Sequence, residues 1–125
     1  MNFDGKVNLN AQKLEDRLID FAVIIVGVVE ALPNSKAGNH IGNQLIRSGT
    51  SPAQNYGEAQ SAESRKDFIH KLKIALKELR ETMVWLKIIA RNGMASRDEM
   101  QLAIKECNEL IAIFVSSTKT ADSNS

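Results

Sequence analysis

Apolar residues recur at alternating spacings of four and three along most of this 125-residue chain. This periodicity limits the fold more than any other feature, because it places apolar side chains on one face of a helix. Ser64 can cap the most regular such segment, and Asn92 with Gly93 can end it. The pattern predicts a helix of about 28 residues, about 42 Å long. Its predicted core stripe is Phe68, Leu72, Ala75, Leu79, Met83, Leu86 and Ala90.

Two further segments carry the same spacing. A helix over about residues 12–32 should end at Pro33 and Asn34, and its stripe is Leu14, Leu18, Phe21, Ile25, Val28 and Leu32. The other faces of this segment are also apolar, which a helix tolerates when more than one of its faces is covered. A last helix should begin at Ser96, which can form a capping box with Glu99. The stripe of that helix is Met100, Ala103, Cys107, Leu110 and Phe114.

The segment RSGTSPAQNY, residues 47–56, has the composition of a loop. The four-and-three spacing nevertheless continues through it, at Ile41, Leu45, Ser48, Pro52, Tyr56 and Ala59. We therefore predict one helix over about residues 37–62, bent at Pro52. Proline costs a helix about 3 kcal/mol unless neighbouring packing supports the bend, and the small residues allow another helix to approach closely. The alternative is a pair of short helices around a loop at residues 48–51.

Four amphipathic helices joined by short connections predict an all-α fold, an up-down-up-down antiparallel four-helix bundle with a proline-bent second helix. The predicted boundaries are an N-terminal arm at residues 1–11, the bundle domain at 12–115, and a polar, disordered tail at 116–125. No signal peptide is recognisable at the N-terminus. The longest apolar run, residues 21–29, is too short to span a bilayer. A lone cysteine adds to these reasons for expecting a cytoplasmic protein.

The block from Gln44 to Ile89 carries a resemblance to a known family. The matching features are Arg47-Ser48, the small residues up to Pro52, and the patterns N-x-x-E-A at residues 55–59 and S-x-K-x-F at 64–68, followed by Ile74-Ala75-Leu76. With these motifs, the chain resembles the bacterial four helix bundle proteins, also called intervening-sequence proteins after genes found inside large-subunit ribosomal RNA genes. The motifs cover about half of the chain.

The resemblance implies a four-helix bundle that assembles into a ring-like homopentamer. It also implies kinship with the accessory variability determinant of diversity-generating retroelements, a basic pentamer that binds nucleic acid and partners a reverse transcriptase. The intervening-sequence members themselves bring no established activity. The present chain differs from its basic relative, because its net charge is only +1.

The charge is unevenly distributed along the chain. Residues 1–35 hold three basic and five acidic side chains, residues 36–91 hold ten and five, and residues 92–125 hold three and five. The net values are therefore −2, +5 and −2. The third predicted helix carries a row of basic residues at spacings of four and three, well away from its core stripe, namely Lys66, His70, Lys73, Lys77 and Arg80.

A row of cations at about one per helical turn could follow a phosphate backbone. The candidate nucleic-acid-binding residues are Arg47, Arg65, Lys66, His70, Lys73, Lys77 and Arg80. No aromatic side chain interrupts the row to stack on bases, so we expect binding without sequence preference. The competing interpretation is an ordinary solvated face, with Glu78 and Glu81 moderating the charge.

The same helix carries a candidate oligomer interface, formed by Ile74, Trp85 and Ile88. These residues lie nearly opposite the core stripe, where a monomer would expose them. The alternative is that the N-terminal arm or a loop covers them. Glu58 and Asn55 lie among small residues, and a buried carboxylate needs a donor. We expect Arg47 or a lysine of the third helix to supply it in a structural role.

The residues needed for catalysis are scarce. Asp67-x-x-His70 is the nearest approach to the di-metal motif of helical bundles, and it occurs once. The chain has two histidines, and Cys107 falls on a core stripe. We therefore expect no enzyme, no metal and no cofactor. The leading hypothesis is a homo-oligomeric binding or assembly module that binds RNA or DNA non-specifically; the alternative is a protein-binding scaffold without a nucleic-acid partner.

Overall fold

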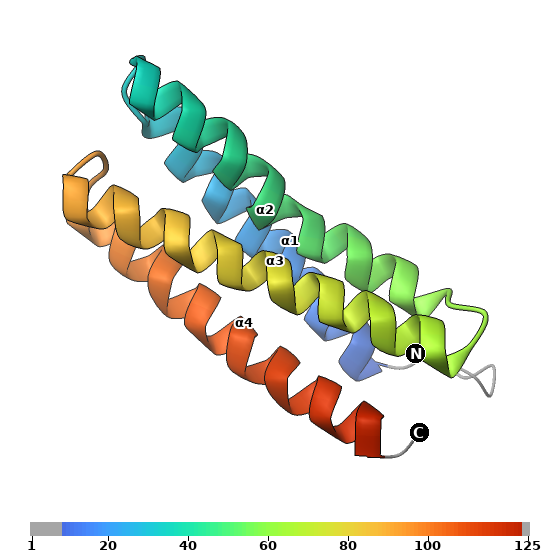
Figure 1. Ribbon diagram of the computed structural model, residues 1–125. Coiled ribbons are helices and arrows are strands. Elements are labelled where there is room, and N and C mark those ends of the chain that lie inside the picture. Colours follow the sequence, from blue (N-terminus) through green and yellow to red (C-terminus); the bar gives the residue numbers. More distant parts are fainter. Residues whose placement is uncertain (1–8, 124–125) are drawn as a thin grey trace.

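The structure is a computed structural model that describes residues 9–123. Its four helices are α1 (Leu9–Ala31), α2 (Lys36–Gln60), α3 (Arg65–Asn92) and α4 (Arg97–Ser123). Each connection has four residues, at positions 32–35, 61–64 and 93–96, so each helix turns back along the one before it (Figure 1). This architecture confirms the predicted antiparallel four-helix bundle.

The predicted chain ends differ from the structure. α1 begins at Leu9, inside the predicted arm, and residues 1–8 lie outside the described residues. The predicted disordered tail is wrong from Ser116 to Ser123, because α4 continues through it. Thr118 and Ala121 are buried there, and the Thr118 hydroxyl donates to the carbonyl of Phe114 at 2.9 Å. Residues 124 and 125, the rest of the predicted tail, lie outside the described residues.

The small-residue segment is helical throughout. α2 runs unbroken with Pro52 inside it, so the alternative of two short helices is wrong; the bend itself stays a prediction. Hydroxyls near the proline donate to carbonyls one turn earlier, from Thr50 to Ile46 and from Ser51 to Arg47, each at 2.6 Å. Pro52 has no N–H to offer the carbonyl of Ser48, and these two hydroxyl bonds reach the carbonyls of the two residues before Ser48.

Capping follows the sequence signals. The Ser64 hydroxyl accepts from the backbone N–H of Asp67 at 3.0 Å, and Gly93 ends α3 with a φ of 73°, in the left-handed region that favours glycine. At the start of α4, the Ser96 hydroxyl accepts from the N–H of Glu99 at 3.3 Å and donates to the Glu99 carboxylate at 3.2 Å. Both predicted helix starts are confirmed.

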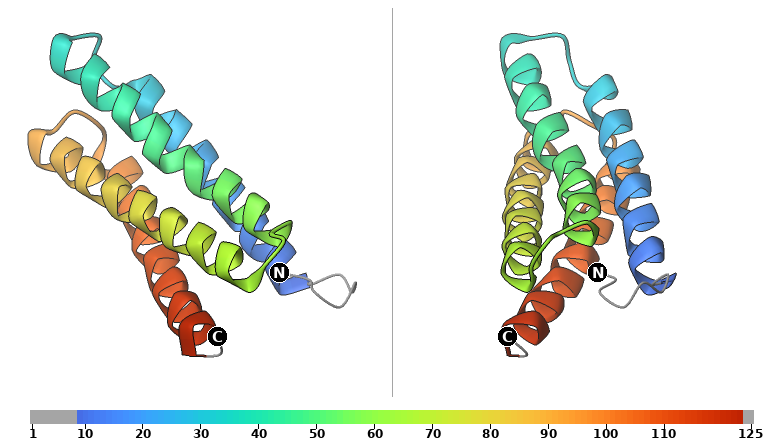
Figure 2. Two further views of the ribbon diagram at one scale, coloured as in Figure 1. Left: turned by 45° about the vertical axis from the view of Figure 1, so that its right-hand side comes forward. Right: turned by 90° about the vertical axis from the view of Figure 1, so that its right-hand side faces the viewer.

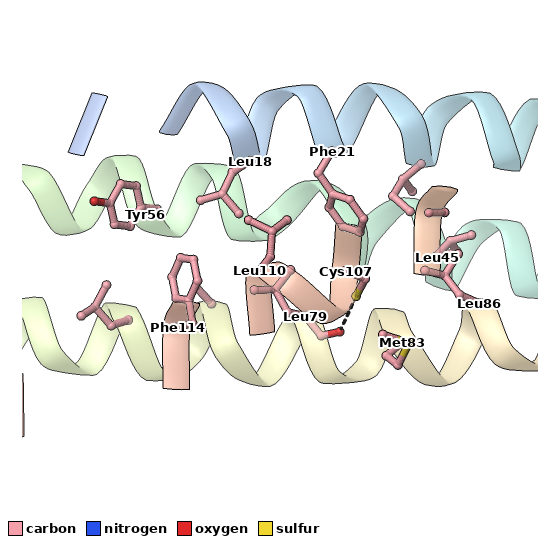
Figure 3. Close-up of a cluster of buried hydrophobic side chains, with 14 of the residues drawn as sticks. Leu18, Phe21, Leu45, Tyr56, Leu79, Met83, Leu86, Cys107, Leu110 and Phe114 are labelled. Atoms are coloured by element: carbon pink, nitrogen blue, oxygen red, sulfur yellow. Dashed lines mark hydrogen bonds between the residues drawn. The ribbon is translucent and has the colours of Figure 1, made fainter. Parts of the chain in front are cut away.

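The core lies along the bundle axis and draws on all four helices (Figure 3). Phe21 of α1, Leu45 of α2, Leu79 of α3 and Phe114 of α4 are all fully buried. Phe114 meets Tyr56 edge to face, with the ring centroids 5.7 Å apart. The core residues of α1, α2 and α4 are largely those of the predicted stripes.

The core face of α3 turns along the helix. Ala90 is exposed, so the predicted stripe is wrong at that end, and Phe68 is half-buried and packs against the edge of the core. Ile69 and Ile89 are buried in their place. The reason is geometric: the neighbouring helices cross α3 at an angle, so the side that faces the core rotates from one end of α3 to the other.

Among the pairs of helices that lie next to each other, α1 and α4 pack against each other least. α1 packs mainly on α2, and α4 packs mainly on α3, at an angle to the other helices (Figure 2). Arg17 of α1 bridges to α4, where its guanidinium pairs with Glu106 and lies 3.6 Å from Glu109. The hydrogen bond to Glu106 raises the pKa of Arg17. None of the helices in the described range is long and apolar enough to cross a membrane.

Cys107 is a core residue, as predicted. Its side chain is fully buried, and its Sγ lies 3.4 Å from the carbonyl oxygen of Leu79 (Figure 3). Burial raises the pKa of the thiol from 9.0 to about 12, and the carboxylate of Glu106 adds to this rise. The thiol is therefore protonated and shielded, unlike a catalytic cysteine.

We expect Cys107 to make the protein less stable above about pH 9. The unfolded chain loses the thiol proton near pH 9 and the folded chain near pH 12, so unfolding is favoured between these values. The free energy of unfolding should fall by about 1.4 kcal/mol for each pH unit in this window. Urea unfolding at pH 8 and pH 10 measures this fall. The Cys107→Ala variant lacks the thiol, so its own pH dependence shows what the other titrating groups contribute. Equal pH dependence in both proteins would show that Cys107 contributes nothing.

Candidate nucleic-acid interface

α3 presents its predicted basic row to solvent. All the candidate residues on this helix are exposed, namely Arg65, Lys66, His70, Lys73, Lys77 and Arg80. Within residues 9–123, no carboxylate lies within ion-pair distance of Lys66, Lys77 or Arg80. These cations therefore keep their charge available to a ligand.

The acidic residues in the middle of α3 are turned towards α2. Glu78 accepts a hydrogen bond of 2.7 Å from the Asn55 side chain, and burial raises the pKa of Glu78. Glu81 pairs with Arg47 at 3.2 Å. Both carboxylates thus bond to residues of α2 at the α2–α3 seam, of which Arg47 is part, and Glu81 also lines a hollow with Lys73, Lys77 and Arg80.

Glu58 has the predicted type of partner but not the predicted environment. Its carboxylate accepts from the Lys71 ammonium at 3.0 Å, which confirms a lysine of α3 as the donor. The Glu58 side chain is 59% exposed, however, so the expectation of a buried carboxylate is wrong. The reason is that Glu58 lies at the edge of the α2–α3 contact.

Two candidate residues on α3, Arg65 and, from the row, Lys73, contact the end of α4. The Arg65 guanidinium donates to the carbonyl of Ala121 at 3.4 Å, and the Lys73 ammonium lies 3.2 Å from the Asp122 carboxylate. Arg65, Lys66, Ile69, His70, Lys73 and Asp122 line a hollow of about 420 Å³ there. Lys73 is partly neutralised, so Lys77 and Arg80 are the stronger phosphate candidates.

The basic row continues beyond the residues predicted from the sequence. After Arg80, the same spacing leads to Val84, Lys87 and Arg91, all exposed. On α4, Lys105 lines a hollow together with Arg80 and Lys87. Lys87 and Arg91 were detectable from the spacing but are separated from the row by Val84. The contribution of Lys105 depends on how α3 and α4 pack.

The candidate interface residues on α3 are more covered than expected. Ile74 and Trp85 are half-buried, and the Trp85 ring meets His40 of α2 edge to face at 6.0 Å. The prediction that a monomer would expose Trp85 is therefore wrong, because α2 covers this side of α3. Ile88 is 39% exposed. A role for the three residues in association stays a prediction.

Another exposed apolar surface lies on α1. Ile19, Val23 and Val26 follow the helical spacing and are 47%, 65% and 39% exposed. The sequence indicated that α1 needs cover on more than one face, and within the described residues this stripe lacks that cover. α1 and α3 are diagonal neighbours without packing contact (Figure 2), so the stripe and the basic row belong to different sides of the bundle.

The few residues suited to metal binding are dispersed. Asp67 and His70 are both exposed, and His40 packs on Trp85. Across residues 9–123, no group of three or more His, Cys, Asp or Glu side chains could hold a metal ion.

The chain is an all-α antiparallel four-helix bundle with a basic row on one helix. The sequence model described as 23S rRNA-intervening sequence protein matches residues 12–116, and the chain belongs to this family. It is also similar to a crystal structure, described as a protein with unknown function from the S23 ribosomal protein family of Bacteroides thetaiotaomicron VPI-5482. The two are 35% identical with a TM-score of 0.81, over 89% of this chain and 99% of the other. No protein of curated function matches.

Proposed function

We propose that this protein is a non-enzymatic, homo-oligomeric binding module of the cytoplasm that holds RNA or DNA through phosphates along α3. The observation that carries the proposal is the exposed row of cations on α3, with Glu78 and Glu81 bonded to residues of α2 instead. A ligand approaching this side meets positive charge over several consecutive turns.

Local charge matters more here than the net charge of +1. The Debye length at physiological salt is about 8 Å, so a bound phosphate senses the nearest cations and little of the acidic residues on the far side. Each phosphate contact adds affinity that falls as salt rises. Non-specific binding follows from the chemistry of the row, because lysine and arginine on an exposed helix contact phosphates without selecting bases.

Replacing Lys77 and Arg80 by glutamate should weaken binding to a mixed-sequence RNA or DNA oligonucleotide by at least about tenfold at low salt. Two phosphate contacts are lost, so the slope of log affinity against log salt should become shallower by about 1.4 for a single strand and about 1.8 for a duplex. Fluorescence anisotropy over a salt series measures both quantities. Light scattering should show an unchanged oligomer.

The matched control replaces two other exposed lysines by glutamate and so reverses their charge. These are Lys13 on α1 and Lys36 at the start of α2. The control changes the net charge as much as the first variant, and we expect it to keep most of the affinity. Equal losses in the two variants would show a general charge effect rather than a site on α3. Absence of binding by the wild type at low salt would refute the proposal.

A second candidate function is a protein-binding scaffold without a nucleic-acid partner. Exposed apolar side chains outside the basic row favour it, among them Val23 and Leu102, at 65% and 57% exposure. Kinship with the accessory variability determinant makes a reverse transcriptase one such partner. This candidate becomes the better one if wild-type protein retains neither RNA nor DNA at low salt but forms a complex with a protein.

A further inference from the structure

Four surface hollows along α3 share lining residues from one to the next, and we call this series the furrow. The hollow at the start of the helix shares Lys73 with the next one, which shares Arg80 and Val84 with a third. The third lies between α3 and α4 and shares Ile104 and Lys105 with a fourth, which reaches Gly93. The furrow therefore follows α3 over most of its 28 residues, or about 42 Å.

The furrow combines cations with an apolar floor, and two carboxylates, Glu81 and Asp122, also line its first two hollows. Its third hollow, of about 480 Å³, shows the combination most clearly: Arg80, Lys87 and Lys105 supply the charge. Met83, Val84, Ile104 and Ile111 supply apolar surface in the same hollow. Val84 is 57% exposed, so part of this floor is open to solvent. A ligand that fits must offer anions and apolar surface side by side.

We infer that the ligand of this furrow is single-stranded nucleic acid rather than a duplex. The inference rests on the proposed function and adds the class of substrate. In a single strand the bases are unpaired, so their faces and the sugars can lie on the apolar floor while the phosphates meet the cations. A duplex keeps its bases inside and presents mainly phosphates and sugars to a surface outside its grooves.

The straight course of the cations leads to the same conclusion. The strands of a duplex wind around its axis once in about 35 Å, so each strand follows a straight row only briefly before it turns away. A single strand is flexible and can follow the row along the length of α3. Charge density alone would favour the duplex, which carries one charge per about 1.7 Å of axis. A preference for the single strand would therefore depend on the shape and the floor of the furrow.

The test compares a labelled DNA strand of about 20 nucleotides, longer than α3 in either form, alone and annealed to its complement. The strand has mixed sequence without self-complementarity, and fluorescence anisotropy is recorded at several salt concentrations. Wild-type protein should bind the single strand about tenfold more tightly. Lys87→Glu combined with Lys105→Glu should weaken that binding and reduce the salt slope for the single strand by about 0.7 for each contact.

A third variant examines the apolar floor. Val84→Asn removes apolar surface from the floor and keeps the charge. It should weaken single-strand binding severalfold, while the salt slope and the duplex binding stay unchanged. Leu102→Asn is its control, because Leu102 is also 57% exposed and lines none of these hollows. Equal or tighter duplex binding would overturn the inference while the proposed function stands. Binding of neither form would refute the proposed function itself.

Discussion

Replacing Gly49 by alanine is expected to lower the free energy of unfolding by about 2 kcal/mol. A Cβ at this position would lie 2.7 Å from Cγ2, 2.8 Å from Cγ1 and 3.1 Å from Cβ of Ile25 on α1. The Cβ of Ile25 cannot rotate away, so α1 and α2 would have to separate. Overpacking of this kind costs about 1–3 kcal/mol or more, and it outweighs the gain of about 1 kcal/mol that alanine brings to a helix interior.

Gly57→Ala is the matched control on the same helix. A Cβ there would meet the Oε1 atom of Glu15 at 3.0 Å, the far end of a flexible side chain that can move. We expect this substitution to be neutral or to stabilise by up to about 1 kcal/mol. Urea unfolding compares the two variants. Each adds one methyl group to a glycine of α2, and the expected changes in the free energy of unfolding have opposite signs.

A second substitution tests whether Ile25 causes the effect. In an Ile25→Ala background, Gly49→Ala should cost much less, because the space that the new methyl group needs has been vacated. Ile25→Ala alone should destabilise by about 2–5 kcal/mol, so the double-mutant cycle should show a large coupling energy. Additive effects would contradict close packing between these two residues.

The helical identity of the small-residue segment could be predicted because its spacing places small or apolar residues on the face that meets other helices. The structure gives the reason for their size: a glycine at position 49 leaves room for Ile25. Ser48, at a predicted core position, is buried and accepts from the Thr82 hydroxyl of α3 at 2.9 Å. That pairing depends on two helices meeting in one register, which periodicity within one helix does not reveal.

The end of α4 could have been predicted from the same signal. Thr118 and Ala121 continue the spacing that leads from Cys107 through Phe114, and both are buried. The polar composition of residues 116–125 outweighed that spacing in the prediction. Threonine can occupy a core position when its hydroxyl donates to a helix carbonyl, as Thr118 does.

The candidate site, too, could be predicted from the sequence only in part. Exposure of the basic row followed from its angle to the core stripe, and the structure confirms that exposure for Lys66, Lys77 and Arg80. The half-burial of Trp85 and the approach of Lys105 to Arg80 depend on where α2 and α4 lie around α3. A single sequence gives the faces of each helix but not their neighbours.

Replacing Val23 by glutamate is expected to dissociate the proposed oligomer, raising the dissociation constant of the contact by at least about hundredfold. Val23 is 65% exposed at the centre of the apolar stripe with Ile19 and Val26. Burying a valine side chain in the contact stabilises it by about 1.5–3 kcal/mol. Burying an unpaired carboxylate in its place destabilises the contact further. Trp85→Glu is a less direct test, because Trp85 packs on His40 and its loss would also disturb the fold.

Light scattering at several concentrations measures the mass, and circular dichroism checks that the variant keeps its helices. The control is Leu102→Glu, which adds the same charge at an exposed apolar residue of α4 and should leave the mass unchanged. Because α1 and α3 lie diagonally apart in the bundle, an assembly through α1 would keep the basic row free. The dissociated Val23→Glu protein should therefore still bind single-stranded DNA, but more weakly, since it loses the avidity of several linked rows. A wild-type monomer, or a variant of unchanged mass, would remove this stripe from any assembly.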